Sequence, residues 1–74
     1  MGENMYGQRI RELRLEKGLK QVELAEALHT TQKNISKYET ELVDLSTAML
    51  IKLCKFFEVS ADYILGIEES FSKI

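Results

Sequence analysis

The stretch QKNISKYE, residues 32–39, gathers side chains that can recognise the edges of base pairs. Ile35 and Tyr38 lie three residues apart and can both point inward on a helix, so the polar residues around them point outward. Gln and Asn amides can pair with an adenine edge, and Lys can donate to guanine or to a phosphate. The outward-pointing residues are Gln32, Lys33, Asn34, Ser36 and Lys37.

A second short helix, expected over residues 21–28, is needed to hold residues 32–39 in place. Its apolar face consists of Leu24, Ala25 and Leu28. Residues 29–31 break this pattern, and Thr31 is a favourable N-cap for the helix that follows. A helix with this outer face, held against its neighbour across the small side chain of Ala25, fits the major groove of DNA.

This arrangement resembles the lambda-repressor/Cro-like (XRE-type) helix-turn-helix family, from about Tyr6 to Gly66. The resemblance rests on Gln21, the pair Leu24-Ala25, Leu28, Ile35 ten residues after Ala25, and the closing residues Ser36-Lys37-Tyr38-Glu39. It implies an all-α, compact five-helix domain in which the second and third helices form the helix-turn-helix. It also implies a transcriptional regulator, most simply a repressor, that binds double-stranded DNA as a homodimer.

Within this resemblance, individual side chains have expected roles. Arg14 is expected to pair with Glu39, and the alternative is two unrelated surface charges. For the polar residues the alternative is a solvated face. The expected base contacts are Gln32, Lys33 and Lys37, and the expected phosphate contacts are Lys20, Gln21, Asn34 and Ser36.

A further helix is expected before this pair, over about residues 5–17. It has Tyr6, Ile10 and Leu13 on its inner face. Gly18 suits the left-handed position that ends such a helix.

Two more helices are expected after the pair. Ser46 is the N-cap candidate for one that runs to about Phe57, and Ser60 for a short one over residues 61–65 that Gly66 ends. Ile64 is expected to face the core. The core stripe of the longer helix is predicted to be Leu50, Leu53, Cys54 and Phe57.

The sequence departs from the family pattern at three places. Lys20 stands where Ser or Thr usually caps the helix, and His29 stands where a Gly commonly supplies positive φ. In the loop 40–45, Glu41 replaces a Gly, Asp44 replaces a common basic residue and Leu45 replaces a Pro. Because acidic side chains repel phosphate, this loop is expected to weaken DNA binding.

Composition and charge favour one globular domain over residues 1–74, with a core at about 6–66 and a short tail at 67–74. The chain is 45% hydrophobic and 30% charged, with a formal net charge of −2. Residues 6–39 carry seven Lys or Arg and five Glu, so the basic part coincides with the helix-turn-helix. No membrane span, secretory signal, cofactor or metal site is expected, and a reducing cytoplasmic setting fits the lone Cys54.

Apolar residues near the C-terminus suggest a second surface, which we call the C-terminal apolar patch. It is predicted to form the homodimer interface, with scattered surface hydrophobes as the alternative. A different class of function stays open, a protein-interaction module such as an antitoxin or a repressor-sequestering regulator that uses the acidic loop and this patch. An enzyme is not expected, because no nucleophile with a base, paired carboxylates or small-molecule substrate cavity is evident. The patch residues are Phe56, Tyr63, Leu65, Ile67 and Phe71.

Overall fold

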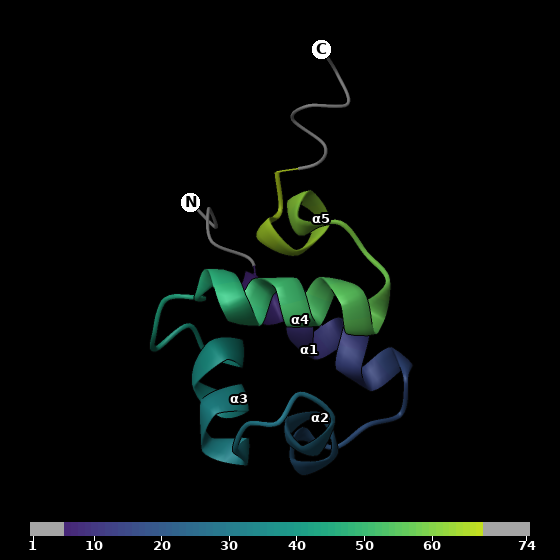
Figure 1. Ribbon diagram of the computed structural model, residues 1–74, viewed down its shortest axis with the longest axis vertical. Coiled ribbons are helices and arrows are strands. Elements are labelled where there is room, and N and C mark those ends of the chain that lie inside the picture. The colour runs from purple at the N-terminus through teal and green to yellow at the C-terminus, as the bar shows by residue number, and fades with distance from the viewer. Residues whose placement is uncertain (1–5, 68–74) are drawn as a thin grey trace.

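The computed structural model describes residues 6–67, and these residues form five helices and no strand. The predicted all-α fold is confirmed, and each helix lies within one or two residues of its predicted bounds. None of the helices in the described part of the chain has the length and apolar character needed to cross a membrane. The helices are α1 (Tyr6–Glu16), α2 (Gln21–Ala27), α3 (Gln32–Glu39), α4 (Thr47–Phe57) and α5 (Ala61–Leu65), shown in Figure 1.

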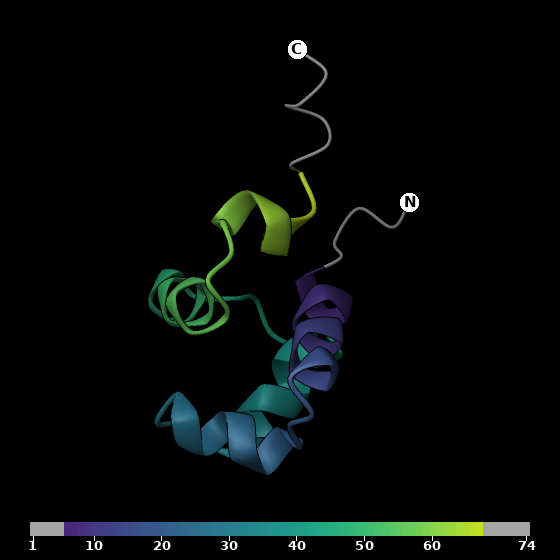
Figure 2. The same cartoon turned by 90° about the vertical axis from the view of Figure 1, so that its right-hand side faces the viewer.

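The helices α2 and α3 lie together at one end of the protein, and α5 lies at the opposite end (Figure 1). Between them α4 crosses in front of α1, as the perpendicular view in Figure 2 also shows. The helix α1 packs against both α3 and α5, so it connects the helix-turn-helix to the rest of the domain.

Side-chain caps start three of the helices, at the residues predicted from the sequence. The hydroxyl of Thr31 accepts from the Asn34 backbone N–H at 3.2 Å. Ser46 and Ser60 accept in the same way, at 3.1 and 3.0 Å, for α4 and α5. Each cap satisfies one of the backbone N–H groups that have no partner in a helix's first turn. At α2 the predicted lack of a side-chain cap on Lys20 is also found, although Glu23 Oε1 accepts from the Lys20 N–H at 2.8 Å.

The core is formed by apolar side chains from all five helices and the α2–α3 turn. Its buried residues are Ile10, Leu13, Leu24, Ala25, Leu28, Ile35, Met49, Leu53, Phe57 and Ile64.

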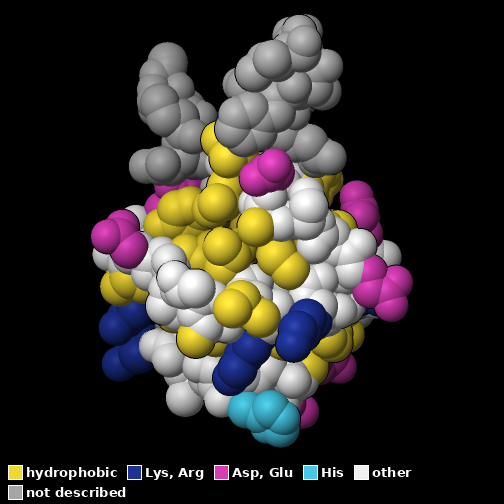
Figure 3. Space-filling view, turned by 45° about the horizontal axis from the view of Figure 1, so that its top comes forward, with side chains coloured by type: hydrophobic (Ala, Val, Ile, Leu, Met, Phe, Trp, Pro, Cys, Tyr) yellow, Lys and Arg dark blue, Asp and Glu magenta, His cyan; other side chains and the backbone are white. Residues whose placement is uncertain are grey.

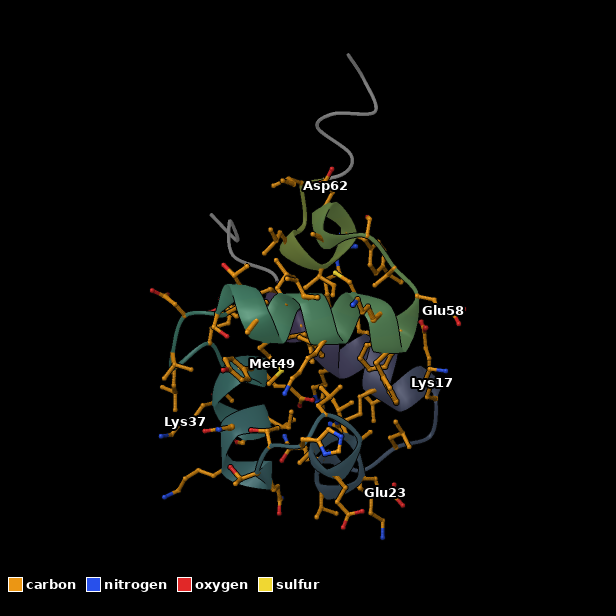
Figure 4. All side chains as sticks on the ribbon, viewed as in Figure 1. Lys17, Glu23, Lys37, Met49, Glu58 and Asp62 are labelled. Atoms are coloured by element: carbon orange, nitrogen blue, oxygen red, sulfur yellow. The ribbon has the colours of Figure 1, made fainter. Side chains whose placement is uncertain are left out.

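The predicted core stripe of α4 is wrong at two of its four positions. Leu53 and Phe57 are buried, but Met49 completes the inner face, and Leu50 and Cys54 are only half-buried. Positions 49, 53 and 57 are four residues apart, which is also a helical spacing. Periodicity alone therefore could not determine which of two adjacent faces of α4 lies in the core. Figure 4 shows Met49 pointing from α4 toward α2 and α3. Partial burial raises the pKa of the Cys54 thiol, which lowers the fraction of reactive thiolate.

Among residues 6–67, three residues other than glycine have positive φ. His29 has φ 59°, which confirms the expectation that the α2–α3 turn requires a left-handed residue. Glu41 also has φ 59°, at the position where the family carries a Gly. Glu58, at φ 58°, ends α4 and was not foreseen.

Gly7 is buried where α1 passes the end of α3. A Cβ at this position would press on the carbonyl oxygen of Glu39 and lie 2.9 Å from its carbonyl carbon and 2.8 Å from Glu41 Cγ. Because the Glu39 atoms are main chain, α1 and α3 would have to move apart.

We therefore expect Gly7→Ala to destabilise the domain, although alanine favours helices. The propensity gain is roughly 1 kcal/mol, whereas overpacking costs typically about 1–3 kcal/mol. A net loss of about 1 kcal/mol or more in the free energy of unfolding should appear in urea denaturation. A more stable variant would show that the two helices are not in close contact.

Tyr6 ties α1 to the loop after α3, because its Oη donates to the Val43 carbonyl oxygen at 2.8 Å. Burial raises the pKa of Tyr6, and the charges of Glu41 and Asp44 raise it further.

Because the pKa of Tyr6 is higher in the folded protein, the unfolded chain loses the phenol proton first as the pH rises above about 10, and the free energy of unfolding falls. Urea denaturation should show a smaller loss between about pH 9 and 11 for Tyr6→Phe than for the wild type. Equal losses would contradict this account.

Candidate nucleic-acid interface

The outer face of α3 carries the predicted polar residues. Gln32, Lys33 and Asn34 are exposed, while Ser36 and Lys37 are half-buried. Figure 4 shows Lys37 pointing away from the body of the protein. On the inner side of the same helix, Ile35 is 1% exposed and anchors α3 to the core. The helix thus presents amide and ammonium groups outward from a fixed base.

An ion pair beneath this surface joins α1 to the end of α3. Arg14 Nε lies 2.7 Å from Glu39 Oε2, and Arg14 Nη2 donates to Glu39 Oε1 at 3.2 Å. Arg14 Nη1 also donates to the Leu19 carbonyl oxygen at 2.7 Å, which fixes the guanidinium plane. The two side chains are only 9% and 3% exposed. Two parallel hydrogen bonds to a carboxylate are a strong and directional arrangement.

Two glutamines extend this network to the surface. Gln21 Nε2 donates to Glu39 Oε1 at 3.0 Å, and Gln32 Nε2 donates to Gln21 Oε1 at 3.4 Å. Gln21 is therefore engaged at both ends of its amide, with one N–H left for an external acceptor. Sequence analysis assigned Gln21 and Gln32 to neighbouring helices. No sequence pattern indicated that hydrogen bonds connect these two side chains to Glu39.

The other expected phosphate contacts differ in how free their side chains are. Lys20 is exposed at the start of α2. Asn34 Nδ2 donates to Thr30 Oγ1 at 2.9 Å, so this amide is partly committed to the turn before α3.

The loop 40–45 exposes less of its negative charge to solvent than the sequence indicated. Glu41 Oε2 accepts from the Gly7 backbone N–H at 3.0 Å, so its carboxylate is turned toward the start of α1. This satisfies an N–H that the first turn of α1 leaves without a helical partner. Asp44 remains exposed, and the neighbouring Leu42 is 75% exposed. Asp44 is therefore the exposed carboxylate of this loop.

The C-terminal apolar patch is only partly open. Phe56 and Tyr63 are half-buried, with the Lys17 Nζ 5.8 Å from the Phe56 ring centroid and the Arg9 guanidinium 4.5 Å from that of Tyr63. Leu65 is half-buried, Ile67 is exposed, and Phe71 lies outside the described residues. Figure 3 shows hydrophobic side chains gathered over α4 and α5 with acidic groups around them.

Two neighbouring residues of α4, to which sequence analysis gave no role, affect the surface and the packing of this helix. Ile51 is 49% exposed and adds apolar area on α4. Lys52 Nζ donates to the Leu28 carbonyl oxygen at 3.0 Å, which satisfies a carbonyl at the end of α2 and ties α4 to the helix-turn-helix.

The five helices share one core, and α3 packs against α2 while its polar face is exposed. This arrangement defines a helix-turn-helix domain. The helix-turn-helix family model matches residues 10–64, and the chain belongs to this family, in its lambda-repressor/Cro-like branch.

Several known proteins are similar to this chain. The HTH-type transcriptional regulator ImmR of Bacillus subtilis is 41% identical over 63 residues, which cover 85% of this chain and 50% of ImmR. The chain spans about half the length of the curated relatives it matches. Among solved structures, the P22 c2 repressor in complex with a synthetic operator has a TM-score of 0.77 at 27% identity, covering 84% of this chain and 94% of that one. The N-terminal DNA-binding domain of SinR from Bacillus subtilis has a TM-score of 0.75 at 35% identity, covering 82% and 90%.

Proposed function

We propose that this protein binds double-stranded DNA in a sequence-specific manner and regulates transcription, most simply as a repressor. The observation that supports this most directly is the outward face of α3, which presents Gln32, Lys33 and Lys37 on a helix that the buried Arg14–Glu39 pair joins to α1. The P22 c2 repressor and SinR, which share this fold, are both known in complexes with operator or DNA.

In this mechanism α3 enters the major groove, with one such helix for each half-site. Gln32 pairs with adenine, and Lys33 and Lys37 donate to guanine or to neighbouring phosphates. Lys20, Gln21, Asn34 and Ser36 fix the register on the backbone. Gln21 and Asn34 each use one amide N–H in an internal hydrogen bond, so each has one amide N–H left to donate to a phosphate.

We further propose a homodimer formed through α4, α5 and the residues that follow. Ile51 and Ile67 are exposed and Leu65 is half-buried in this region, where Figure 3 shows the apolar gathering. A two-fold axis would repeat α3 at the spacing of one helical turn of DNA.

Selection of bound sequences from random duplex DNA tests the function as a whole. Enrichment of a palindrome with half-sites about 10 base pairs apart supports both recognition and dimerisation. Enrichment of a single half-site supports recognition and contradicts the dimer. No enrichment at low salt would contradict the proposed function.

Asp44 gives a test of the loop's role in binding. We expect Asp44→Lys to tighten binding to the selected duplex, and to make the slope of log K against log salt more negative by about 0.9 for one added phosphate contact. Glu58→Lys is the matched control, since it makes the same charge change on the opposite side of the protein from Lys37 (Figure 4). Equal gains in both variants, measured by fluorescence anisotropy, would show that only net charge matters.

A protein-interaction module is the second candidate, and the exposed Leu42 between Glu41 and Asp44 favours it. It predicts a stable complex with a protein partner and no retention of duplex DNA at low salt. The same selection experiment distinguishes the two candidates.

A further inference from the structure

A small pocket opens between the end of α2, the α2–α3 turn and the second half of α4. Its volume is about 310 Å³, at the lower limit for sites that enclose a drug-sized molecule. The pocket therefore has room for one large side chain and little more. None of the residues that line it is among the expected base or phosphate contacts. The lining residues are Ala27, Leu28, His29, Lys52, Lys55 and Phe56.

The apolar walls of this pocket are held in place by the core. Leu28 is 4% exposed and belongs to the core itself. The Phe56 ring packs edge-on against the buried Phe57, with ring centroids 5.0 Å apart and an interplanar angle of 80°. Lys52 is also held, because its Nζ donates to the Leu28 carbonyl oxygen at 3.0 Å. A side chain that enters the pocket therefore meets a preorganised surface, which lowers the cost of binding.

The rim of the pocket carries hydrogen-bond donors and positive charge. Lys52 and Lys55 are exposed, and the exposed His29 adds a ring N–H. In the described part of the chain, no Asp or Glu lines the pocket. Figure 3 shows Lys or Arg side chains in dark blue and a histidine in cyan next to hydrophobic side chains. Apolar walls beneath a cationic rim complement a group that is apolar and bordered by carboxylates.

We propose that this pocket binds an acidic segment of a partner protein. One large apolar side chain of that segment fills the pocket, and its carboxylates lie beside Lys52 and Lys55. A small molecule fits less well because the pocket is too small to enclose one, and DNA fits less well because phosphates bring no apolar group to the walls. The inference goes beyond the proposed function and does not depend on DNA binding.

A synthetic peptide tests the proposal, with one phenylalanine placed between pairs of glutamates. Fluorescence anisotropy should show saturable binding below about 1 mM peptide. Replacing the peptide's phenylalanine by serine removes the apolar anchor and should weaken binding by about tenfold or more. Replacing its glutamates by glutamine should weaken binding by about fivefold, because several exposed charge pairs are lost together. Phenylacetate, the small-molecule probe, should bind at least about tenfold more weakly than the peptide.

Two variants of the protein locate the binding site. Ala27→Leu fills the pocket from an exposed helical position, and Lys55→Glu reverses a charge at its rim. Each should weaken peptide binding by about fivefold or more while circular dichroism stays as in the wild type. Arg11→Glu is the matched control, since Arg11 is exposed on α1 and does not line the pocket. It should change the affinity by less than about twofold.

Several results would overturn the proposal in different ways. No saturation, or equal binding of the peptide that lacks phenylalanine, would show that the pocket takes no apolar anchor. Unchanged binding by Ala27→Leu, or equal weakening by Lys55→Glu and Arg11→Glu, would place the peptide elsewhere. Because Phe56 also belongs to the C-terminal apolar patch, sedimentation should show the same oligomeric state for Ala27→Leu and the wild type. A loss of dimer in that variant would assign the pocket to an interface between copies, and displacement of the peptide by the selected duplex would assign it to the DNA-binding surface.

Discussion

Replacing Arg14 by methionine is expected to lower the free energy of unfolding by about 3–5 kcal/mol. The change leaves Glu39 as an unpaired charge with a side chain that is only 3% exposed. It also removes the donor to the Leu19 carbonyl oxygen. Small domains are stable by only about 5–15 kcal/mol, so this loss is a large part of the total. Urea denaturation followed by circular dichroism measures it.

The double variant Arg14→Met with Glu39→Leu provides the control. Removing both partners eliminates the unpaired charge, and an apolar pair of similar volume is often nearly neutral. We expect the double variant to be clearly more stable than Arg14→Met alone. If the single variant lost less than about 1 kcal/mol, the pair would behave like an exposed surface ion pair.

Replacing Gln32 by alanine is expected to weaken binding to the selected duplex by about 1–3 kcal/mol and to relax selectivity at one base pair. Gln32 is exposed at the start of α3, so the fold itself should not suffer. Fluorescence anisotropy with singly substituted duplexes gives both the affinity and the selectivity.

Gln8→Ala is the matched control for this variant. Gln8 is also exposed, lies on α1 and donates to Glu12, so its loss removes an amide without touching α3. Its binding should match the wild type. A loss of the same size on every duplex for Gln32→Ala would show that Gln32 contacts the backbone and does not read a base.

Much of the fold could be predicted because local signals agreed with each other. Thr31, Ser46 and Ser60 are strong N-caps, and Gly18 and Gly66 have the positive φ that ends a helix. These features depend on a few neighbouring residues, so the sequence alone located the helices.

The inner face of α4 could not be predicted in the same way. Two helical spacings were available there, and the choice depended on which side chain fits beneath the helix. Met49 is long and flexible, and it is buried in the core, whereas Leu50 packs against the core only half-buried. Such a choice is made by packing between distant helices, which periodicity does not encode.

Sequence analysis of the site named individual residues but not their connections. It assigned roles to Gln21, Gln32 and Glu39 separately, because each was matched to a position in the family pattern. The hydrogen bonds that join them depend on the angle between α2 and α3. Likewise, the hydrogen bond from Gly7 to Glu41 depends on α1 meeting the loop after α3.

A crystal structure of the protein with its selected duplex tests the central claim most directly. We predict that α3 lies in the major groove and that the Gln32 amide is within hydrogen-bonding distance of a base edge. A complex in which α3 faces solvent, or in which the DNA contacts lie on α4 and α5, would contradict it.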